Sequence, residues 1–500
     1  MSLPVIPQIL IENIAGRLLE TDCDCLVVGV GDEGAMTRTA ADIDQQMDGW
    51  LTRSIDTGLI KTSCGEMLLM PMPPATRALQ QAARSLLVVG FGKATQLDRG
   101  KAHTLGATIL RRLCDVQRDL VVVSLDPLVA VECHDSFIAG SITGCDGQAI
   151  YATEPKSFAP TKIAFEDVSA EAIVRGKTIG DSINIVRRLV NEPPNRMYPQ
   201  LFAEAAQAVA SEVGLEVEVW DEQRLEAEGC RALLAVGAAS TQPSRMVILH
   251  HHGAADSLPS IALVGKGVTF DSGGLSIKPN EGMIDMKCDM AGAATVLGVL
   301  RALAIMKVPV NVIGLCGLAE NMISGDAFKL GDVIETRKGT MIEILNTDAE
   351  GRVVLADVLD VAVQHRPAAI IDLATLTGAC MVALGRDVAG LMTNNEPLCS
   401  EIRSAAGGQG ELVWQLPMFD FYREQINSKV ADIKNVGDGR WGGAITAAKF
   451  LEQFVDCVPW VHIDIAGPAF AESAKPHRDA GATGVMLRTL VGWLQARAAG

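Results

Sequence analysis

Apolar residues in this chain gather in short continuous runs, and between the runs they recur with the spacing of a helix. In the first third, the runs cover residues 25–30, 86–90 and 120–123, and a helix-like stretch covers residues 100–113. Continuous Val- and Leu-rich runs that alternate with helices are typical of a mostly parallel sheet, whose strands are buried on both faces. The pattern therefore predicts an α/β domain in residues 1–160.

A single long helix is predicted to follow this domain. Residues 168–190 are amphipathic, and the segment "NEPP" at residues 191–194 ends the pattern, because proline cannot continue a helix. We interpret residues 161–195 as a linker built around this helix.

A second and larger α/β pattern fills residues 196–500. Its predicted strands cover residues 246–249, 261–264, 310–315, 369–373 and 461–465, and its predicted helices include residues 289–305 and 444–454. We expect a second, larger α/β domain with a central mixed sheet flanked by helices.

Bulk properties narrow the class of protein. A chain of 500 residues is long for one core, which agrees with two domains. The formal net charge of −17 argues against an indiscriminate nucleic-acid binder, because such proteins show a basic footprint. The 12 cysteines include no C-x-x-C pair and suit a reducing compartment.

Signals for export or membrane insertion are not evident. The first 16 residues lack the basic region of a signal peptide, and no apolar run is long enough to span a bilayer. We therefore expect a cytoplasmic protein without a membrane partner.

Polar residues concentrate at the ends of predicted strands in the second domain, where open α/β sheets bind their ligands. The segment "VGKGVTFDSGGLSIKP", residues 264–279, carries Lys266, Asp271 and Lys278. Its Gly-Lys-Gly is interpreted as a strand-end turn, because the spacing of a Walker phosphate loop is absent. The segment "MIDMKCDMAGAATVLG" carries Asp289 at a predicted helix start, where a simple N-cap is the alternative to a chemical role.

The segment "NTDAEGR", residues 346–352, places Asp348, Glu350 and Arg352 at alternate positions after an apolar run. On a strand, these side chains would share one face, where they would repel or pair. A solvated, salt-bridged turn between a strand and a helix explains the same pattern. The segment alone does not choose between these interpretations.

Together the three segments supply four carboxylates, each near small residues: Asp271, Asp289, Asp348 and Glu350. Buried carboxylates must be paired or bind metal, and two divalent ions cancel a formal charge of about −4, whereas two lysines cancel about half of it. No segment contains His, which excludes H-E-x-x-H zinc motifs. An oxygen-rich site suits Zn, Mn, Mg or Co. His250–His252 follow a predicted strand end, and we interpret them as a polar loop rather than a metal site.

Six strings carry a resemblance to a known family: "GKGVTFDSGGLSIKP", "MKCDMAGAA", "NTDAEGRVVLAD", "DLATLTGAC", "GGAITAAKFL" and "HIDIAGPA". They are similar to the leucyl aminopeptidases, also called cytosol aminopeptidases (peptidase family M17). The resemblance is dense over residues 186–494 and rests on layout alone in the N-terminal third. It implies a smaller, macro-like N-terminal α/β domain and a larger catalytic α/β domain.

The resemblance also implies an activity and an assembly. A metal-dependent enzyme would remove Leu and other aliphatic residues from the N-termini of peptides. It would form a homohexamer, built as a dimer of trimers.

Roles for individual residues follow from the same resemblance. Two divalent ions, Mn or Zn first and Mg or Co as alternatives, would be held by Lys266 (uncharged), Asp271, Asp289, Asp348 and Glu350. Lys278 would stabilise the oxyanion of the reaction. Arg352 would hold a bicarbonate ion that replaces a general base, helped by the backbone around Ala349, Gly351 and Leu376. The pocket for the first side chain would be lined by Met286, Thr375, Gly378 and Ala466.

Two other functions stay open. A two-metal phosphoesterase uses a similar carboxylate-rich site but does not need a free α-amine on its substrate. A DNA-binding regulator is the second alternative, because some members of the resembling family bind DNA. The net charge argues against DNA binding as the main role.

Overall fold

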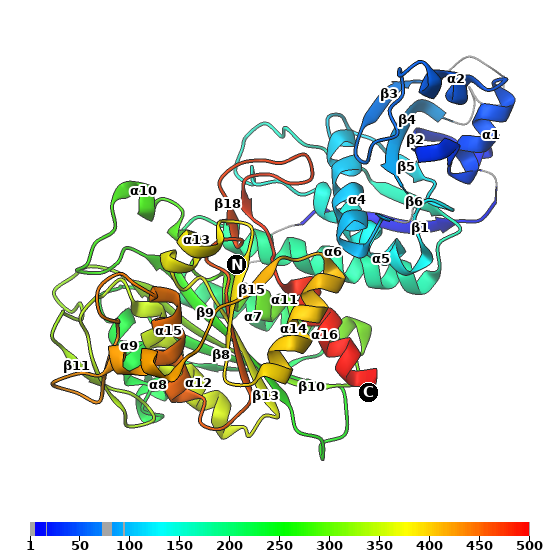
Figure 1. Ribbon diagram of the computed structural model, residues 1–500. Coiled ribbons are helices and arrows are strands. Elements are labelled where there is room, and N and C mark those ends of the chain that lie inside the picture. The colour runs from blue at the N-terminus through cyan, green and yellow to red at the C-terminus, as the bar shows by residue number, and fades with distance from the viewer. Residues whose placement is uncertain (1–5, 17, 73–82, 94–95, 500) are drawn as a thin grey trace.

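The computed structural model describes residues 6–16, 18–72, 83–93 and 96–499. An N-terminal α/β part and a larger C-terminal α/β part lie side by side, with the long helix α6 between them (Figure 1). Each part has its own sheet and its own buried apolar core. The expected two-domain α/β architecture is confirmed.

The N-terminal part is built on a six-stranded sheet in the order β1-β6-β5-β2-β4-β3. Its strands are β1 (Leu10–Ile14), β2 (Cys23–Gly31), β3 (Met67–Pro71), β4 (Ala83–Gly92), β5 (Leu120–Val123) and β6 (Lys162–Glu166). Neighbouring strands are parallel except for the pair β3–β4. The apolar runs predicted as strands lie in β2, β4 and β5, which confirms the mostly parallel sheet.

Helices pack on this sheet and on each other. They are α1 (Arg38–Gln46), α2 (Trp50–Asp56), α4 (Arg99–Leu113) and α5 (His134–Gly144). The backbones of α4 and α5 approach closely because glycine stands at the contact: a Cβ on Gly140 would lie 1.9 Å from the carbonyl oxygen of His103. The predicted helix over residues 100–113 is α4.

The linker helix α6 (Ala170–Asn191) begins after Ser169, whose side chain accepts a hydrogen bond from the N–H of Ala172 (3.1 Å). It ends two residues before Pro193, as predicted. One face packs on α5 in the N-terminal part, and another contributes Val186 and Leu189 to the core of the C-terminal part. The helix therefore holds the two parts together, while the boundaries near residues 160 and 195 stay predictions.

The C-terminal part is built on an eight-stranded sheet in the order β15-β14-β17-β13-β9-β10-β8-β7. Its strands are β7 (Glu216–Trp220), β8 (Arg245–His252), β9 (Ile261–Asp271), β10 (Asn311–Asn321), β13 (Ala369–Ala374), β14 (Ala389–Thr393), β15 (Val413–Gln415) and β17 (Trp460–Asp464). The central strands β10, β9, β13 and β17 are parallel, whereas β8 and β14 run antiparallel to β10 and β17. The predicted mixed sheet is confirmed.

Two buried helices cover opposite faces of this sheet. Helix α11 (Ala291–Met306) shares one core with Val247 and Leu263, and α12 (Glu350–Gln364) shares the other core with Met246 and Val264. The remaining helices are α7 (Pro199–Val213), α8 (Glu222–Ala227), α9 (Arg231–Gly237), α10 (Asn280–Met283), α13 (Gly378–Leu384), α14 (Glu396–Gln409), α15 (Gly443–Leu451) and α16 (Leu487–Ala499). The remaining strands are β11 (Val333–Glu335), β12 (Met341–Glu343), β16 (Ile433–Lys434), β18 (Phe470–Ala471) and β19 (Gly481–Ala482).

One helical segment is long and apolar enough to pass for a membrane span by length and composition alone. Residues Asn280–Met306 reach a mean hydropathy of 1.6, yet 89% of the most apolar window is buried inside the protein. The segment is apolar on all sides because α11 is enclosed by the sheet, α6 and α16.

The expectation of a polar loop at His250–His252 is wrong. These residues are the last three of β8; all three pair with β10, and His250 also pairs with Glu216 of β7. Their polar side chains made this strand end look like a loop, but His252 is exposed and buried His251 is hydrogen-bonded to the carbonyl oxygen of Val308.

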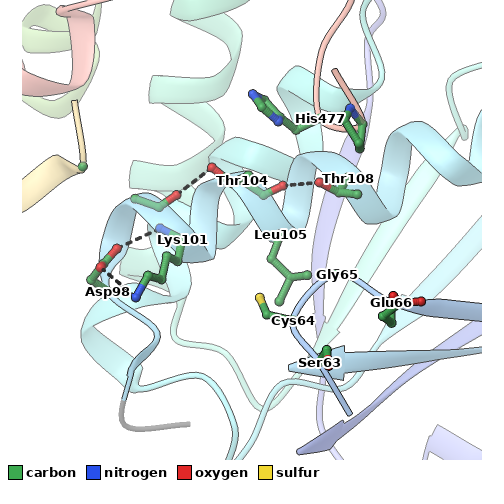
Figure 2. A pocket seen from close by; sticks show the side chains of 13 residues that line it. Ser63, Cys64, Gly65, Glu66, Asp98, Lys101, Thr104, Leu105, Thr108 and His477 are labelled. Carbon is green, nitrogen blue, oxygen red and sulfur yellow. Dashed lines mark hydrogen bonds and ion pairs between the residues drawn. The ribbon is translucent and has the colours of Figure 1, made fainter. Parts of the chain in front are cut away.

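A cavity of about 630 Å³ opens between the two parts. Lys101, Thr104 and Thr108 line it from α4, and His477 approaches from the C-terminal part (Figure 2). None of the residues predicted to carry chemistry lines this cavity. The candidate site therefore lies elsewhere, at the ends of the central strands.

Candidate metal centre

Strand β9 positions the first two functional side chains in the middle of the sheet. Its residues up to Asp271 are almost all buried, which explains the continuous apolar run in the sequence. Gly265 lets α11 approach: a Cβ at this position would lie 2.5 Å from the Cα of Ala293. Lys266 thereby sits between the sheet and the helices, and Asp271 stands at the strand end.

The loop after β9 turns back on itself and returns Lys278 to the strand end. Gly273 and Gly274 have φ values of +86° and +62°, which L-residues with side chains rarely adopt. The Nζ of Lys278 lies 2.8 Å from Oδ2 of Asp271 and also pairs with the carboxylate of Asp348. The double glycine is therefore what allows Lys278 to reach the carboxylates.

The "NTDAEGR" segment is the junction between a loop and a helix, not a strand. Strand β12 ends at Glu343, and α12 begins at Glu350. Asp348 lies in the loop, whereas Glu350 and Arg352 lie in the first turn of α12. The shared-strand-face interpretation is wrong. The alternative is correct in placing a turn into a helix here, but wrong in expecting a solvated one, because Glu350 and Arg352 are buried.

A buried asparagine braces this junction from a distant part of the chain. The side chain of Asn435 donates to the carbonyl oxygen of Asn346 (2.6 Å) and accepts from the N–H of Leu345 (2.9 Å). Its own carbonyl oxygen accepts from Nη1 of Arg352 (2.8 Å). One residue thus fixes both ends of the segment that carries Asp348 and Glu350.

Replacing Asn435 by Ala is expected to destabilise the protein by about 2 kcal/mol, because two backbone groups lose their buried partner. Thermal unfolding measures the loss. Asn394→Ala is the matched control: its side chain also bonds two backbone groups, at Val458 and Trp460, but it is exposed and water can replace it. Equal destabilisation of the two variants would contradict the bracing role of Asn435.

Asp289 does not cap α11. It follows a short 3-10 turn at Met286–Cys288, and the residue at the N-cap position is Met290, without a side-chain hydrogen bond. Oδ1 of Asp289 instead accepts from Nζ of Lys266 (2.7 Å) and from Oγ1 of Thr375 (2.7 Å). The N-cap alternative is therefore wrong.

The four carboxylates and two lysines form one cluster. Nζ of Lys266 is 2.7 Å from Asp289 and 2.8 Å from Oε1 of Glu350, and it donates to the carbonyl oxygen of Thr375 (3.0 Å). Asp271, Asp348 and Glu350 each offer an oxygen atom, and these atoms all lie within 4.8 Å of one another. Three stretches of the chain, residues 266–278, residue 289 and residues 348–350, are thus brought to one point.

Burial and like charges shift the pKa values in this cluster. Burial, together with the neighbouring Glu350, raises the pKa of Asp271 to about 6 and holds that of Asp289 well above its usual range. Burial alone would lower the pKa of Lys266, but Asp289 and Glu350 outweigh it and raise the pKa above the ordinary value. Four carboxylates thus share two lysines, and the raised pKa values of Asp271 and Asp289 show that it is costly to hold their charges together without a further cation.

The cluster fits divalent cations. Oδ2 of Asp289 and Oε2 of Glu350 are buried without a hydrogen-bond partner in the described structure. Orphaned buried carboxylate oxygens are costly, and a cation is the partner that oxygen atoms at this spacing can share. All five predicted ligands lie in the cluster, although ligation itself stays a prediction.

Arg352 is buried like most carboxylates of the cluster. Its side chain is buried, and its Nε has no partner among the described residues. Burial lowers the pKa of its guanidinium to about 10, which keeps it charged at neutral pH. A buried cation with a free donor suits a small anion.

Gly351 and Leu376, whose backbones are predicted to help bind this anion, make other contacts in the structure. Gly351 permits the approach of Lys266, because a Cβ there would lie 2.6 Å from Nζ. The N–H of Leu376 donates to Oδ1 of Asp464 (3.2 Å), and Ala349 precedes α12. Their predicted contact with an anion is not tested.

Of the predicted pocket residues, Ala466 and Gly378 lie by Asp464, whereas Thr375 contacts Asp289. The N–H of Ala466 donates to Oδ1 of Asp464 (3.1 Å), and the hydroxyl of Thr377 donates to Oδ2 (2.7 Å), just before Gly378 begins α13. Thr375 joins this region to Asp289. Met286 is half-buried beside Asp289 in sequence.

Sequence reasoning missed several residues that support the cluster. Asn321 ends β10 beside Asp271, and its Nδ2 donates to Oδ1 of Asp271 (2.8 Å) and to the carbonyl oxygen of Thr347 (2.9 Å). A polar residue that closes an apolar strand was the available signal. Asp372 and His462 form a second buried pair, with Nδ1 of His462 2.6 Å from Oδ1 of Asp372.

Comparison with family models covers most of the chain. The model for the catalytic domain of the cytosol aminopeptidase family matches residues 184–491, and the model for the N-terminal domain of that family matches residues 27–145. The two matches fall on the C-terminal and N-terminal parts of the structure.

Individual proteins agree with the family models. A probable cytosol aminopeptidase from Rhodopirellula baltica is 62% identical over 439 residues, which cover 87% of this chain and 86% of the relative. One from a Geobacter species is 39% identical over 501 residues, which cover 97% and 99%.

Solved structures are also similar. A tomato leucine aminopeptidase variant matches with a TM-score of 0.86 at 31% identity, covering 98% of this chain and 97% of that one. The bottromycin maturation enzyme BotP in complex with Mn matches with a TM-score of 0.83 at 31% identity, covering 95% and 99%.

Proposed function

This chain belongs to the cytosol aminopeptidase family, and we propose that it removes Leu and other aliphatic residues from the N-termini of peptides by a two-metal, water-mediated hydrolysis. Family membership makes it a metallo-aminopeptidase, a hydrolase. The observation that carries the finer proposal is the convergence of Asp271, Asp348 and Glu350 within 4.8 Å, next to two lysines.

The proposed ligands of two divalent ions are Lys266, Asp271, Asp289, Asp348 and Glu350. Lys266 pairs with Asp289 and Glu350 as an ammonium in this structure, and it would ligate as the free amine because two nearby cations would depress its pKa. Such ions, when bound, lower the pKa of a water molecule and polarise a carbonyl group. Mn is the ion named in the similar BotP structure, and Zn, Mg and Co remain alternatives. The mutual repulsion of the carboxylates favours cation binding.

Lys278 is proposed to stabilise the oxyanion that develops on the scissile carbonyl. Its side chain is 16% exposed and stands at the rim of the carboxylate cluster, and its pKa is raised by Asp271 and Glu350 despite burial. A charged amine at this place meets the developing negative charge without reorganisation of water.

Arg352 is proposed to hold a bicarbonate ion, with the backbone around Ala349, Gly351 and Leu376. The buried guanidinium has a donor without a partner in the described structure. A proton acceptor is needed there because the cluster contains no histidine, and every carboxylate in it is proposed as a metal ligand.

The pocket for the first substrate side chain is proposed to be Met286, Thr375, Gly378 and Ala466. Small and apolar side chains suit an aliphatic residue such as Leu. The proposal extends to a homohexamer in the cytoplasm, a dimer of trimers, which light scattering would test.

A free α-amine on the substrate separates this function from the phosphoesterase alternative. Metal-reconstituted protein is expected to cleave leucine amides and Leu-peptides, to leave their N-acetylated forms intact, and to leave p-nitrophenyl phosphate intact. The assay is run with Mn, Zn, Mg and Co across a panel of aminoacyl substrates. Cleavage of acetylated peptides at the rate of free peptides would overturn the proposal.

Replacing Arg352 by Ala is expected to lower kcat by only about tenfold, because the metal ligands and Lys278 remain. Added bicarbonate is expected to raise the rate of the wild type and not that of the variant. Arg403→Ala, an exposed arginine that contacts Gln415, is the control and retains full activity. A bicarbonate response that survives in Arg352→Ala would remove the assigned role.

A further inference from the structure

Half of the eight histidines of this chain gather at one end of the large sheet. His250, His251 and His252 end β8, and His365 follows the last residue of α12. Residues two apart on a strand face the same side, so His250 and His252 share a face and His251 faces the other. His251 is buried with its Nε2 2.9 Å from the carbonyl oxygen of Val308, which leaves three imidazoles together.

These three imidazoles have the spacing of ligands on one ion. The ring centres of His250 and His252 are 5.6 Å apart, and those of His250 and His365 are 5.9 Å apart. Two imidazoles on one tetrahedral ion have ring centres about 5 Å apart, because each bound nitrogen lies about 2 Å from the metal. The rings of His250 and His252 are stacked face to face, so both would have to turn about their side-chain torsions for one nitrogen of each to face a shared ion.

The surrounding charges favour a cation. Glu216 stands opposite His250 in the register of β7 and β8, and its Oε2 lies 3.3 Å from Nε2 of His252. His365 lies at the C-terminal end of α12, where the helix dipole is negative. The negative charge of Glu218 also favours positive charge at His250 and His365. The nearby cation Arg337 is paired with Asp360 and Glu228, which weakens its repulsion of a bound metal ion.

We propose that His250, His252 and His365, with Glu216, form a surface site for a divalent transition-metal ion of the zinc class, separate from the carboxylate cluster. Imidazole suits Zn, Ni and Cu, whereas Mn and Mg prefer oxygen.

The site closes as the ion binds. In the described structure the group of acids whose ligand atoms already lie within 4.8 Å of one another is Asp271, Asp348 and Glu350, and the histidine ligands do not yet converge to that degree. An ion at His365 would tie the C-terminal end of α12 to the sheet edge, while the first turn of the same helix carries Glu350. Binding to the folded state alone would stabilise the protein.

Metal stoichiometry tests the proposal. Full-length protein is first saturated with Mn²⁺ and then titrated with Ni²⁺ and, separately, with Zn²⁺, and bound metal is counted by elemental analysis. The double variant His252→Asn/His365→Asn is expected to bind one Ni²⁺ per chain fewer than the wild type. Each single variant is expected to lower the affinity of that ion at least about tenfold, since even an outer partner of a ligand contributes this much.

His477→Asn is the matched control, because this histidine lies by the cavity near α4, away from β8. It is expected to bind as many Ni²⁺ ions as the wild type. Thermal unfolding in EDTA checks that the exposed substitutions leave the fold intact, and X-ray absorption at the Ni edge is expected to lose an imidazole shell only in the double variant. Equal Ni²⁺ binding by wild type and double variant would overturn the site, whatever the peptidase assay gives.

Discussion

Replacing Glu350 by Ala is expected to abolish hydrolysis of leucine p-nitroanilide, with kcat/KM lower by about 10³-fold or more. Oε1 of Glu350 lies 2.8 Å from Lys266, its other oxygen is buried without a partner, and it converges with Asp271 and Asp348. Removing it takes one charge from the centre of the cluster, so a cation there loses its most enclosed ligand. Steady-state kinetics with added Mn²⁺ measure the effect.

The fold is expected to survive this change. Lys266 keeps its contact with Asp289 and the carbonyl oxygen of Thr375, so no lone charge is left behind. Glu335→Ala is the control: this glutamate is half exposed, pairs with Arg231 on the surface, and is expected to have no effect on kinetics. Circular dichroism and thermal unfolding verify folding, and wild-type turnover by folded Glu350→Ala would end the metal-ligand assignment. The same outcome is expected for Asp271→Ala.

Strand positions were predictable because the physics behind them is local. Parallel strands buried on both faces require continuous apolar runs, and these runs mark β2, β4, β5, β9 and β13 in the sequence. The end of α6 was predictable because Pro193 forbids another turn. The polar end of β8 did not follow this rule. His250–His252 belong to the strand because their backbones pair with β10, while the side chain of His252 is exposed and that of buried His251 has a hydrogen-bond partner in Val308.

The candidate site was predictable as a set of residues but not as a geometry. Asp271, Asp289, Asp348 and Glu350 stand out because carboxylates among apolar and small residues need partners. The pairing of each lysine with a particular carboxylate depends on how β9, α11 and α12 pack. Local patterns in the sequence do not predict this packing. Asn321 and Asn435 were missed because their bonds join segments 26 and 89 residues apart.

Replacing Gly351 by Ala is expected to lower kcat/KM by about 10²-fold, because a displacement of about 1 Å in a catalytic group can cost that much. A Cβ at this position would lie 2.5 Å from Cε and 2.6 Å from Nζ of Lys266. These atoms end a flexible side chain, so Lys266 moves while α12 stays in place. The lysine then loses its contacts with Asp289 and Glu350 at 2.7 and 2.8 Å.

Stability is expected to respond differently from activity, which makes this substitution informative. Ala is a better helix former than Gly by about 1 kcal/mol, so the local effect within α12 offsets part of the strain. Gly407→Ala in α14 is the control, because no atom lies within 4 Å of its added Cβ and the same helix preference applies. The control is expected to keep full activity with a slightly higher Tm. Full activity in Gly351→Ala would mean that the position of Lys266 is not critical, and its place in the metal centre would have to be abandoned.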